Sequence, residues 1–149
     1  MLFIYRLFIN FIYVVSPIIF LYRLVKGKER IDSYKEKIGF FKKNRKKKII
    51  WFHGASVGEI KSIIPILEKF EKDKSINQIL ITSNTLSSLK IIQKIKLKKI
   101  IHQFFPIDTN FICQKFLNHW KPSKVFFIDS EIWPNMILNL EKKKYLLFY

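Results

Sequence analysis

The chain has 149 residues, enough for one domain with a modest core and too few for two domains of ordinary size. Its 28 lysines and arginines outnumber its 11 acidic residues, and the formal charge of +17 favours anionic partners such as phosphates, nucleic acid or an acidic membrane surface. A genome-wide bias would give the same charge, because isoleucine, lysine, phenylalanine and asparagine are abundant and Ala55 is the only alanine.

Residues 2–25 form a long apolar segment with four interruptions, at Arg6, Asn10, Ser16 and Pro17. Its length is close to the roughly 20 residues that cross a bilayer. Arg6 and Asn10 are costly at the centre of a span, which leaves open a shallower, interfacial helix. In either case we predict a membrane anchor over residues 1–25. The basic flank over residues 23–30 favours a cytoplasmic location for the rest of the chain.

Residues 26–48 are polar, and we predict a basic linker that includes the run K-K-N-R-K-K-K over residues 42–48. Two interpretations of this run are equally compatible with the sequence. It is either a surface that gathers anionic head groups or phosphorylated substrate, or a solvated linker in a lysine-rich protein. The predicted folded domain spans residues 49–149.

Within this domain, strand-like and helix-like segments alternate. Apolar runs predict buried strands at residues 49–52, 79–81, 101–105, 124–128 and from Tyr145 onward. Helical spacing of apolar residues predicts helices after Glu59, over residues 86–95, after the N-cap Thr109 and from Asn135, with a kink at Pro65. The alternation predicts an α/β fold with a Rossmann-like parallel sheet.

Polar clusters follow the predicted strands, at the edge where open parallel sheets bind ligands. The first cluster, H-G-A-S-V-G-E over residues 53–59, is glycine-rich and precedes a helix, so its backbone amides and the helix dipole favour negative charge. We therefore expect Glu59, the carboxylate in this turn, to be functional. The last predicted strand is still running at Tyr149, and we expect the protein to continue beyond it.

Residues 54–58 match G-x-S-x-G, the nucleophile elbow of α/β-hydrolases, in a strand–turn–helix context. A serine esterase that uses Ser56 is therefore one alternative. It requires a histidine after the triad acid, and the one candidate after Asp108 is His119, in a predicted helix. A noncatalytic basic module that binds membrane or nucleic acid through residues 42–48 is the other alternative.

Metal and nucleotide motifs are absent from the sequence. The pattern H-x-x-S-x-x-E over residues 53–59 is no established ligand spacing, and neither a phosphate loop nor a dinucleotide fingerprint occurs. The single cysteine, Cys113, excludes an intramolecular disulfide, and we interpret it as a small apolar residue inside a helix. We expect no metal ion and no cofactor.

Four motifs occur in the order and spacing of one family: W-F-H-G-A-S-V-G-E at 51–59, I-T-S-N-T at 81–85, F-P-I-D at 105–108 and D-S-E-I-W-P-N at 129–135. Together with the membrane-proximal start, they make the chain resemble the 3-deoxy-D-manno-octulosonic acid (Kdo) transferases of lipopolysaccharide synthesis. The resemblance covers nearly all of this chain, but only the acceptor-side, N-terminal half of the family's protein.

The resemblance implies a GT-B glycosyltransferase with two Rossmann-like domains, anchored at the cytoplasmic face of the bacterial inner membrane. Such an enzyme moves Kdo from CMP-Kdo onto a lipid A precursor, lipid IVA, without a metal ion. Glu59 matches the family's proposed general base, which takes the proton from the attacking sugar hydroxyl. Asp129 matches a glutamate proposed to stabilise the transition state; aspartate keeps the charge but is one methylene shorter.

On the acceptor side, the resemblance implies roles for Ser56 and Gly58 of S-V-G-E and for Glu131, which matches the family's second glutamate. Lys37 belongs to K-x-K-I-G, which resembles the family's R-E-R-L-G, and lysine is a weaker phosphate clamp than arginine. The donor-binding second domain is missing, so we expect the 149-residue chain alone to be inactive. The expected partners are CMP-Kdo, the lipid A precursor and the inner membrane, with no nucleic acid.

Overall fold

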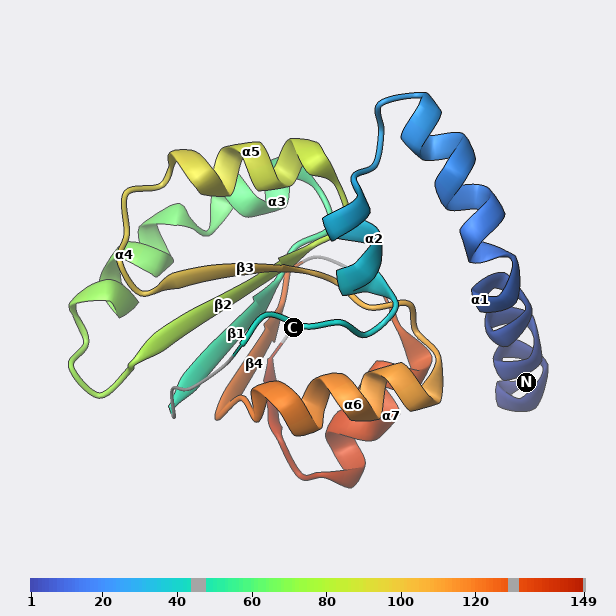
Figure 1. The fold of residues 1–149 in the computed structure, drawn as a ribbon. Helices are drawn as coiled ribbons and strands as arrows, with labels where there is room; N and C mark the ends of the chain where they lie inside the picture. Colours follow the sequence, from blue (N-terminus) through green and yellow to red (C-terminus); the bar gives the residue numbers. More distant parts are fainter. Residues whose placement is uncertain (44–47, 129–131, 149) are drawn as a thin grey trace.

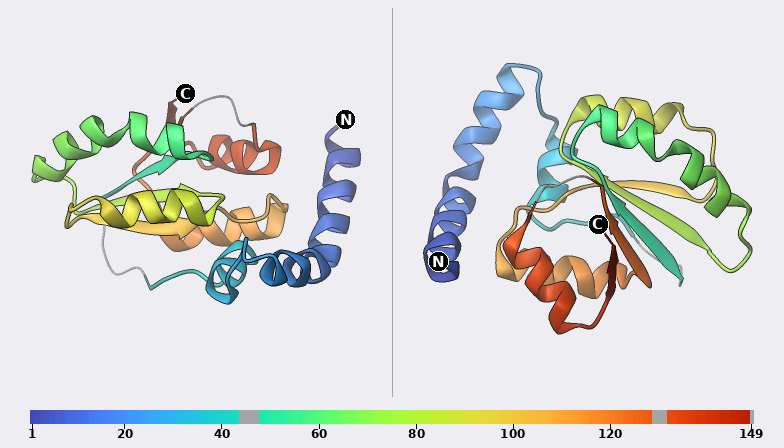
Figure 2. Two further views of the ribbon diagram at one scale, coloured as in Figure 1. Left: turned by 90° about the horizontal axis from the view of Figure 1, so that it is seen from above. Right: turned by 180° about the vertical axis from the view of Figure 1, so that it is seen from behind.

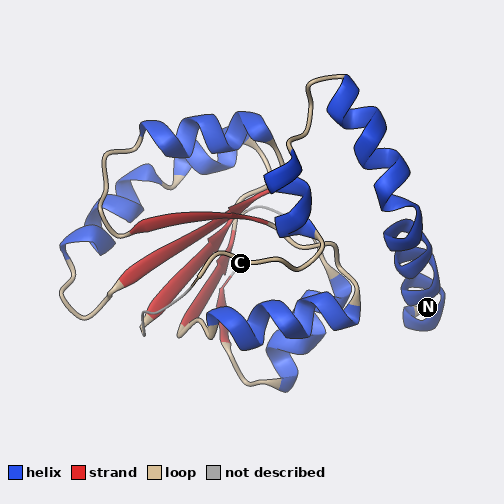
Figure 3. Cartoon of the chain, in the orientation of Figure 1, coloured by secondary structure: helices blue, strands red, loops and turns tan. Residues whose placement is uncertain are grey.

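The computed structural model describes residues 1–43, 48–128 and 132–148 (Figure 1). Its centre is a five-stranded parallel sheet with the order β3-β2-β1-β4-β5. The strands are β1 (Ile49–His53), β2 (Gln78–Ser83), β3 (Ile100–Phe104), β4 (Lys124–Phe127) and β5 (Leu146–Phe148). The helices are α1 (Leu2–Val25), α2 (Ile31–Lys37), α3 (Val57–Ser62), α4 (Ile64–Lys72), α5 (Leu86–Lys94), α6 (Asn110–Trp120) and α7 (Pro134–Lys142) (Figure 3). This architecture confirms the predicted Rossmann-like α/β fold preceded by an apolar helix.

Helices cover both faces of the sheet, which explains why its inner strands are apolar without alternation. Ile49 and Trp51 of β1 pack in a cluster with side chains of α6 and α7. Ile50 and Phe52 belong to the cluster on the opposite face, with side chains of α3, α4 and α5 (Figure 2). All of β1 is buried, so this strand is central to both the sheet and the core.

The helix predicted after Glu59 is two helices in the structure. α3 ends at Ser62, and α4 begins at Ile64 with Pro65 in its first turn. Proline lacks an N–H and suits the first turn of a helix, so Pro65 starts a new helix instead of kinking a longer one. The predicted N-cap at Thr109 is confirmed, since its hydroxyl accepts a hydrogen bond from Ile112 N at 3.3 Å.

Within residues 26–48, which we expected to be a linker, α2 packs against the end of β3. The buried Glu36 carboxylate accepts a hydrogen bond from Phe104 N at 2.7 Å, and Lys37 O accepts one from Ile107 N at 2.9 Å. Lys42 Nζ donates to His102 O at 2.6 Å. These contacts make α2 and the residues after it part of the α/β domain.

α1 is long and apolar enough, by length and composition, to cross a membrane, with a mean hydropathy of 1.9. Only 11% of its most apolar stretch is buried, unlike a helix in the core of a globular domain. It lies alongside the domain at the side toward which the strands point (Figures 1 and 2). Its two buried residues are Ile9 and Ser16.

Candidate active site

The carboxyl ends of β1 and β4 form the topological switch point of the sheet. The chain runs from β1 to β2 on one side and from β4 to β5 on the other, and open α/β sheets bind ligands where the direction reverses in this way. His53 pairs with Phe127 at this edge, and His53 O accepts a hydrogen bond from Ile128 N at 2.9 Å. The turn over residues 54–56 and α3 follow β1 directly, which places Glu59 at the switch point.

Gly54 allows α3 to pack closely against the end of β1. A Cβ at this position would lie 2.9 Å from Ile60 Cδ1 and 3.4 Å from Glu59 Cβ. Ile60 is completely buried, so a larger residue at position 54 would displace α3 and Glu59 together. Gly58 differs, because it is exposed and a Cβ there would meet only Ser56 Oγ, at 3.8 Å. Packing therefore does not require a glycine at position 58, and the surface above the first turn of α3 is open.

Ser56 and Glu59 form a reciprocal capping box at the start of α3. Ser56 Oγ accepts a hydrogen bond from Glu59 N at 3.2 Å, and Glu59 Oε1 accepts one from Ser56 N at 3.2 Å. Glu59 Oε2 also accepts a hydrogen bond from Ala55 N at 2.8 Å. The half-buried carboxylate is thus fixed in orientation, while each of its oxygens retains a lone pair for a ligand.

Lys37 lies on α2, where its ammonium pairs with Glu29 Oε2 at 2.8 Å and sits 5.4 Å from the centre of the Phe104 ring. The Glu29 carboxylate is buried and also contacts Ser33 and Arg23. Burial raises the pKa of Glu29, but hydrogen bonds from Lys37 and Ser33 and the charges of Lys37 and Arg23 outweigh burial, so the pKa lies below its usual value. The structure therefore shows Lys37 in an ion pair within the fold.

This ion pair predicts a pH-dependent contribution to stability. The pKa of Glu29 is lower in the folded chain than its usual 4.5. The ionised Glu29 therefore stabilises the fold fully above pH 4.5, and this stabilisation is lost as the pH falls through the folded-state pKa. We expect Glu29→Gln to lower the free energy of unfolding by about 1–3 kcal/mol at pH 7 and by less at pH 3.5. Urea denaturation at both pH values measures the difference. The matched control is Glu141→Gln, at an exposed position of α7. An equal loss of stability for Glu29→Gln at both pH values would contradict the prediction.

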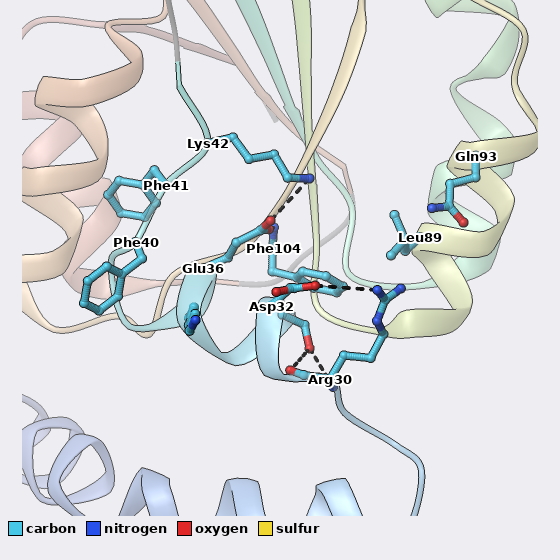
Figure 4. Close-up of a pocket in the computed structure, with 11 residues that line it drawn as sticks. Arg30, Asp32, Glu36, Phe40, Phe41, Lys42, Leu89, Gln93 and Phe104 are labelled. Atoms are coloured by element: carbon cyan, nitrogen blue, oxygen red, sulfur yellow. Dashed lines mark hydrogen bonds and ion pairs between the residues drawn. The ribbon is translucent and has the colours of Figure 1, made fainter.

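A pocket of about 430 Å³ opens beside α2, between this helix, the segment after it and α5 (Figure 4). Two of its cations are paired, Arg30 with Asp32 at 3.6 Å and Lys42 with Glu36 at 3.2 Å. Lys35, the remaining cation of the lining, forms no ion pair with the described residues. Phe40, Phe41 and Phe104 supply apolar walls. The pocket can accommodate a ligand that combines an anionic group with an apolar part.

Asp108 joins the F-P-I-D motif to the W-P-N motif. Its completely buried carboxylate accepts hydrogen bonds from Asn135 N at 2.9 Å and Met136 N at 2.8 Å, in the first turn of α7. Tyr5 of α1 donates its hydroxyl to the same carboxylate at 2.7 Å. Burial, then the hydrogen bond and charge of Asp108, raises the pKa of Tyr5. Asp108 thus caps α7 and binds α1, and it does not serve as the acid that a Ser56 esterase would need.

Cys113 of α6 is buried beside Asp108, which confirms its interpretation as a helix residue in the core. Its Sγ lies 3.1 Å from Asp108 Oδ1. Burial, then the charge of Asp108, raises the pKa of the Cys113 thiol. The thiol is therefore protonated and acts as a donor to Asp108.

The structure places the predicted site residues in two groups. Ser56, Gly58 and Glu59 lie together in the turn and first helical residues after β1, whereas Lys37 lies on α2 beside β3. Asp129 and Glu131 fall outside the residues that the structure describes. The roles of Asp108 and Glu29 were not predicted. The sequence signals for Asp108 were its place in the F-P-I-D motif, just after a predicted strand, and its candidacy as a triad acid.

The chain is a Rossmann-like α/β domain in which the turn after β1 places the Glu59 carboxylate at the switch point of the sheet. Residues 32–149 match the model of a family described as 3-deoxy-D-manno-octulosonic-acid transferase (kdotransferase). The chain is 36% identical over 140 residues to a probable mitochondrial 3-deoxy-D-manno-octulosonic acid transferase of Arabidopsis thaliana, covering 91% of this chain and 31% of that protein. It is 38% identical over 147 residues to the 3-deoxy-D-manno-octulosonic acid transferase of Rickettsia bellii, covering 95% of this chain and 35% of the relative.

The chain therefore belongs to the Kdo transferase family of glycosyltransferases. It spans about a third of the length of these two relatives. The matched part includes the switch point and the capping box at Ser56 and Glu59.

Proposed function

We propose that this chain is the acceptor-side part of a glycosyltransferase that moves Kdo from CMP-Kdo onto a lipid A precursor, lipid IVA, in the synthesis of the lipopolysaccharide core. The observation that carries the proposal is the position of Glu59. Its carboxylate lies at the switch point of a domain of the Kdo transferase family, fixed by two backbone hydrogen bonds.

In the proposed step, the oxygen of an acceptor hydroxyl bonds to the anomeric carbon of Kdo. The bond between that carbon and the phosphate oxygen of CMP breaks, and CMP leaves with the electron pair. Glu59 acts as the general base that takes the hydroxyl proton. The remaining lone pairs of its two oxygens support this role, because backbone N–H groups occupy only one position on each.

The other roles in the proposal follow from the family motifs. Asp129 stabilises charge in the transition state, and Ser56, Gly58 and Glu131 contact the acceptor. The exposed surface around Ser56 and Gly58 supports such a contact. Lys37 also lies on the acceptor side in this proposal, and it must share or leave its ion pair with Glu29 to bind a phosphate.

The donor is held mainly by a second domain, which corresponds to the larger part of the relatives that this chain does not match. A protein limited to these 149 residues would therefore be inactive alone. We place the enzyme at the cytoplasmic side of the bacterial inner membrane, where α1 is the anchor. A Ser56 esterase is less well supported, because the Ser56 hydroxyl serves as the helix N-cap and Asp108 is committed to α7.

The test is a transfer assay with the full-length protein in its native membrane vesicles. We expect labelled Kdo to move from CMP-Kdo to lipid IVA, with and without EDTA, and the product mass to rise by one or more Kdo units. The intact mass of the polypeptide should exceed what 149 residues account for. Absence of transfer, together with labelling of Ser56 by a serine-directed phosphonate, would overturn the proposal in favour of the esterase.

A further inference from the structure

α1 contacts the α/β domain at two places, near its first turn and over residues 16–23. Near the N-terminus, the Tyr5 hydroxyl donates to Asp108 Oδ2 at 2.7 Å, and Arg6 Nε donates to Asn135 Oδ1 at 2.9 Å. Both partners lie after strands, at the carboxyl edge of the sheet. The arginine that is costly inside a bilayer thus has a protein partner.

The same side of the helix is held at its other end. Ser16 Oγ lies 3.0 Å from Tyr34 Oη, and the Phe20 ring stacks on the Tyr34 ring with centroids 4.2 Å apart. Arg23 Nε lies 3.4 Å from Glu29 Oε2. The outermost of these contacts, at residues 5 and 23, are roughly 27 Å apart at the rise of an α-helix.

The opposite side of α1 is apolar and exposed. At 100° per residue, positions 7, 14, 18 and 25 fall within about 20° of one line, and position 16 lies on the far side of the helix. The side chains on this line are Leu7, Val14, Ile18 and Val25, with exposed fractions of 62%, 75%, 68% and 87%. Other large exposed apolar side chains flank them, at Phe3, Ile4, Phe8, Phe11, Leu21 and Tyr22.

We propose that α1 lies in the plane of the membrane surface, with this apolar face in the lipid and its opposite face on the α/β domain. A helix that is attached to a charged domain at both ends cannot cross the hydrocarbon core while those contacts persist, because the domain would have to enter the bilayer with it. The basic residues at the end of the helix suit anionic head groups, and they include Arg23, Lys26, Lys28 and Arg30.

This geometry also orients the domain. Asp108 and Asn135 lie at the carboxyl edge of the sheet, so an in-plane α1 brings that edge, and Glu59 with it, next to the membrane surface. An acceptor carried by a lipid would be presented there. This consequence rests on the proposed function, whereas the in-plane position of α1 does not.

The test measures membrane depth along the apolar line. Single cysteines at Leu7, Val14, Ile18 and Val25 carry an environment-sensitive fluorophore, in full-length protein bound to vesicles of phosphatidylcholine and phosphatidylglycerol. Lipids with quenchers at defined depths then report where each label lies. We expect all four labels to be quenched at the same shallow depth. Ser16→Cys, on the domain-facing side, is the matched control and should be shielded from every quencher. The unsubstituted protein, treated with the same fluorophore, gives the background from the buried Cys113 and from any thiol in the rest of the full-length protein.

Two results would overturn the proposal. A depth profile that is deepest at Val14 and Ile18 and shallow at Leu7 and Val25 indicates a helix that crosses the bilayer. Absence of quenching at all four positions indicates that the apolar face does not meet lipid. Since neither readout uses Kdo transfer, the outcome is independent of whether the proposed enzymatic activity holds.

Discussion

Glu59→Gln is expected to reduce the rate of Kdo transfer by the full-length protein by roughly 10²–10⁴-fold, the usual contribution of a general base. Glutamine is nearly the same size and can still accept the hydrogen bond from Ser56 N. It loses one acceptor, so the hydrogen bond from Ala55 N is the main structural loss, and the free energy of unfolding should fall by about 1 kcal/mol. The variant should therefore lose most of its transfer activity and keep most of its stability.

The two controls for this experiment lie in the same turn and on α7. Ser56→Ala removes the N-cap hydroxyl and should cost about 1 kcal/mol of stability with a far smaller loss of transfer. Glu141→Gln, at an exposed position of α7, should change neither quantity. If Ser56→Ala abolished activity while Glu59→Gln left it intact, the ranking would contradict Glu59 as the base.

The largest loss of stability is expected from Asp108→Asn. Aspartate accepts hydrogen bonds from Asn135 N, Met136 N and the Tyr5 hydroxyl, whereas the amide group of asparagine would point a donor at some of them. Burial leaves no water to replace the lost partners. We expect the free energy of unfolding to fall by about 3–5 kcal/mol, as when one member of a buried charged network is removed.

Thermal and urea denaturation of the full-length protein measure this loss, and the drop in melting temperature should be about 10 °C. Asp32→Asn is the matched control. Asp32 is exposed and lies 3.6 Å from Arg30, and removal of such a surface pair should change stability by less than about 1 kcal/mol. Equal melting temperatures for Asp108→Asn and Asp32→Asn would show that the buried network contributes little.

The sheet could be predicted because its signal is local. A run such as Ile49–His53 is apolar at nearly every position, and β1 is buried on both faces as that pattern indicates. The N-cap at Thr109 could also be predicted, because it depends only on a threonine that directly precedes a helical pattern. The division into α3 and α4 near Pro65 could not be predicted, because the helical spacing of apolar residues does not show where one helix ends and the next begins.

The contacts that could not be predicted join residues distant in sequence. Tyr5 and Asp108 are 103 residues apart, and Arg6 and Asn135 are 129 residues apart. α2 has only seven residues, too short for a clear periodic pattern. Its Glu36 binds Phe104 of β3, 68 residues away, and its Lys37 pairs with Glu29 in the segment before α2. Family motifs predicted a role for Glu59, but they did not predict the structural roles of the buried carboxylates Asp108 and Glu29.

The attachment of α1 to the domain has a practical consequence for preparing the protein. Apolar N-terminal helices are commonly deleted to obtain material that stays in solution without detergent. Here such a deletion would take a hydrogen-bond donor from Asp108, leave the Asn135 side chain without Arg6, and uncover the Tyr34 ring that Phe20 covers. A shortened protein would therefore start with a weakened cap on α7, which begins at Pro134 within the D-S-E-I-W-P-N motif, and its kinetics would describe an altered domain.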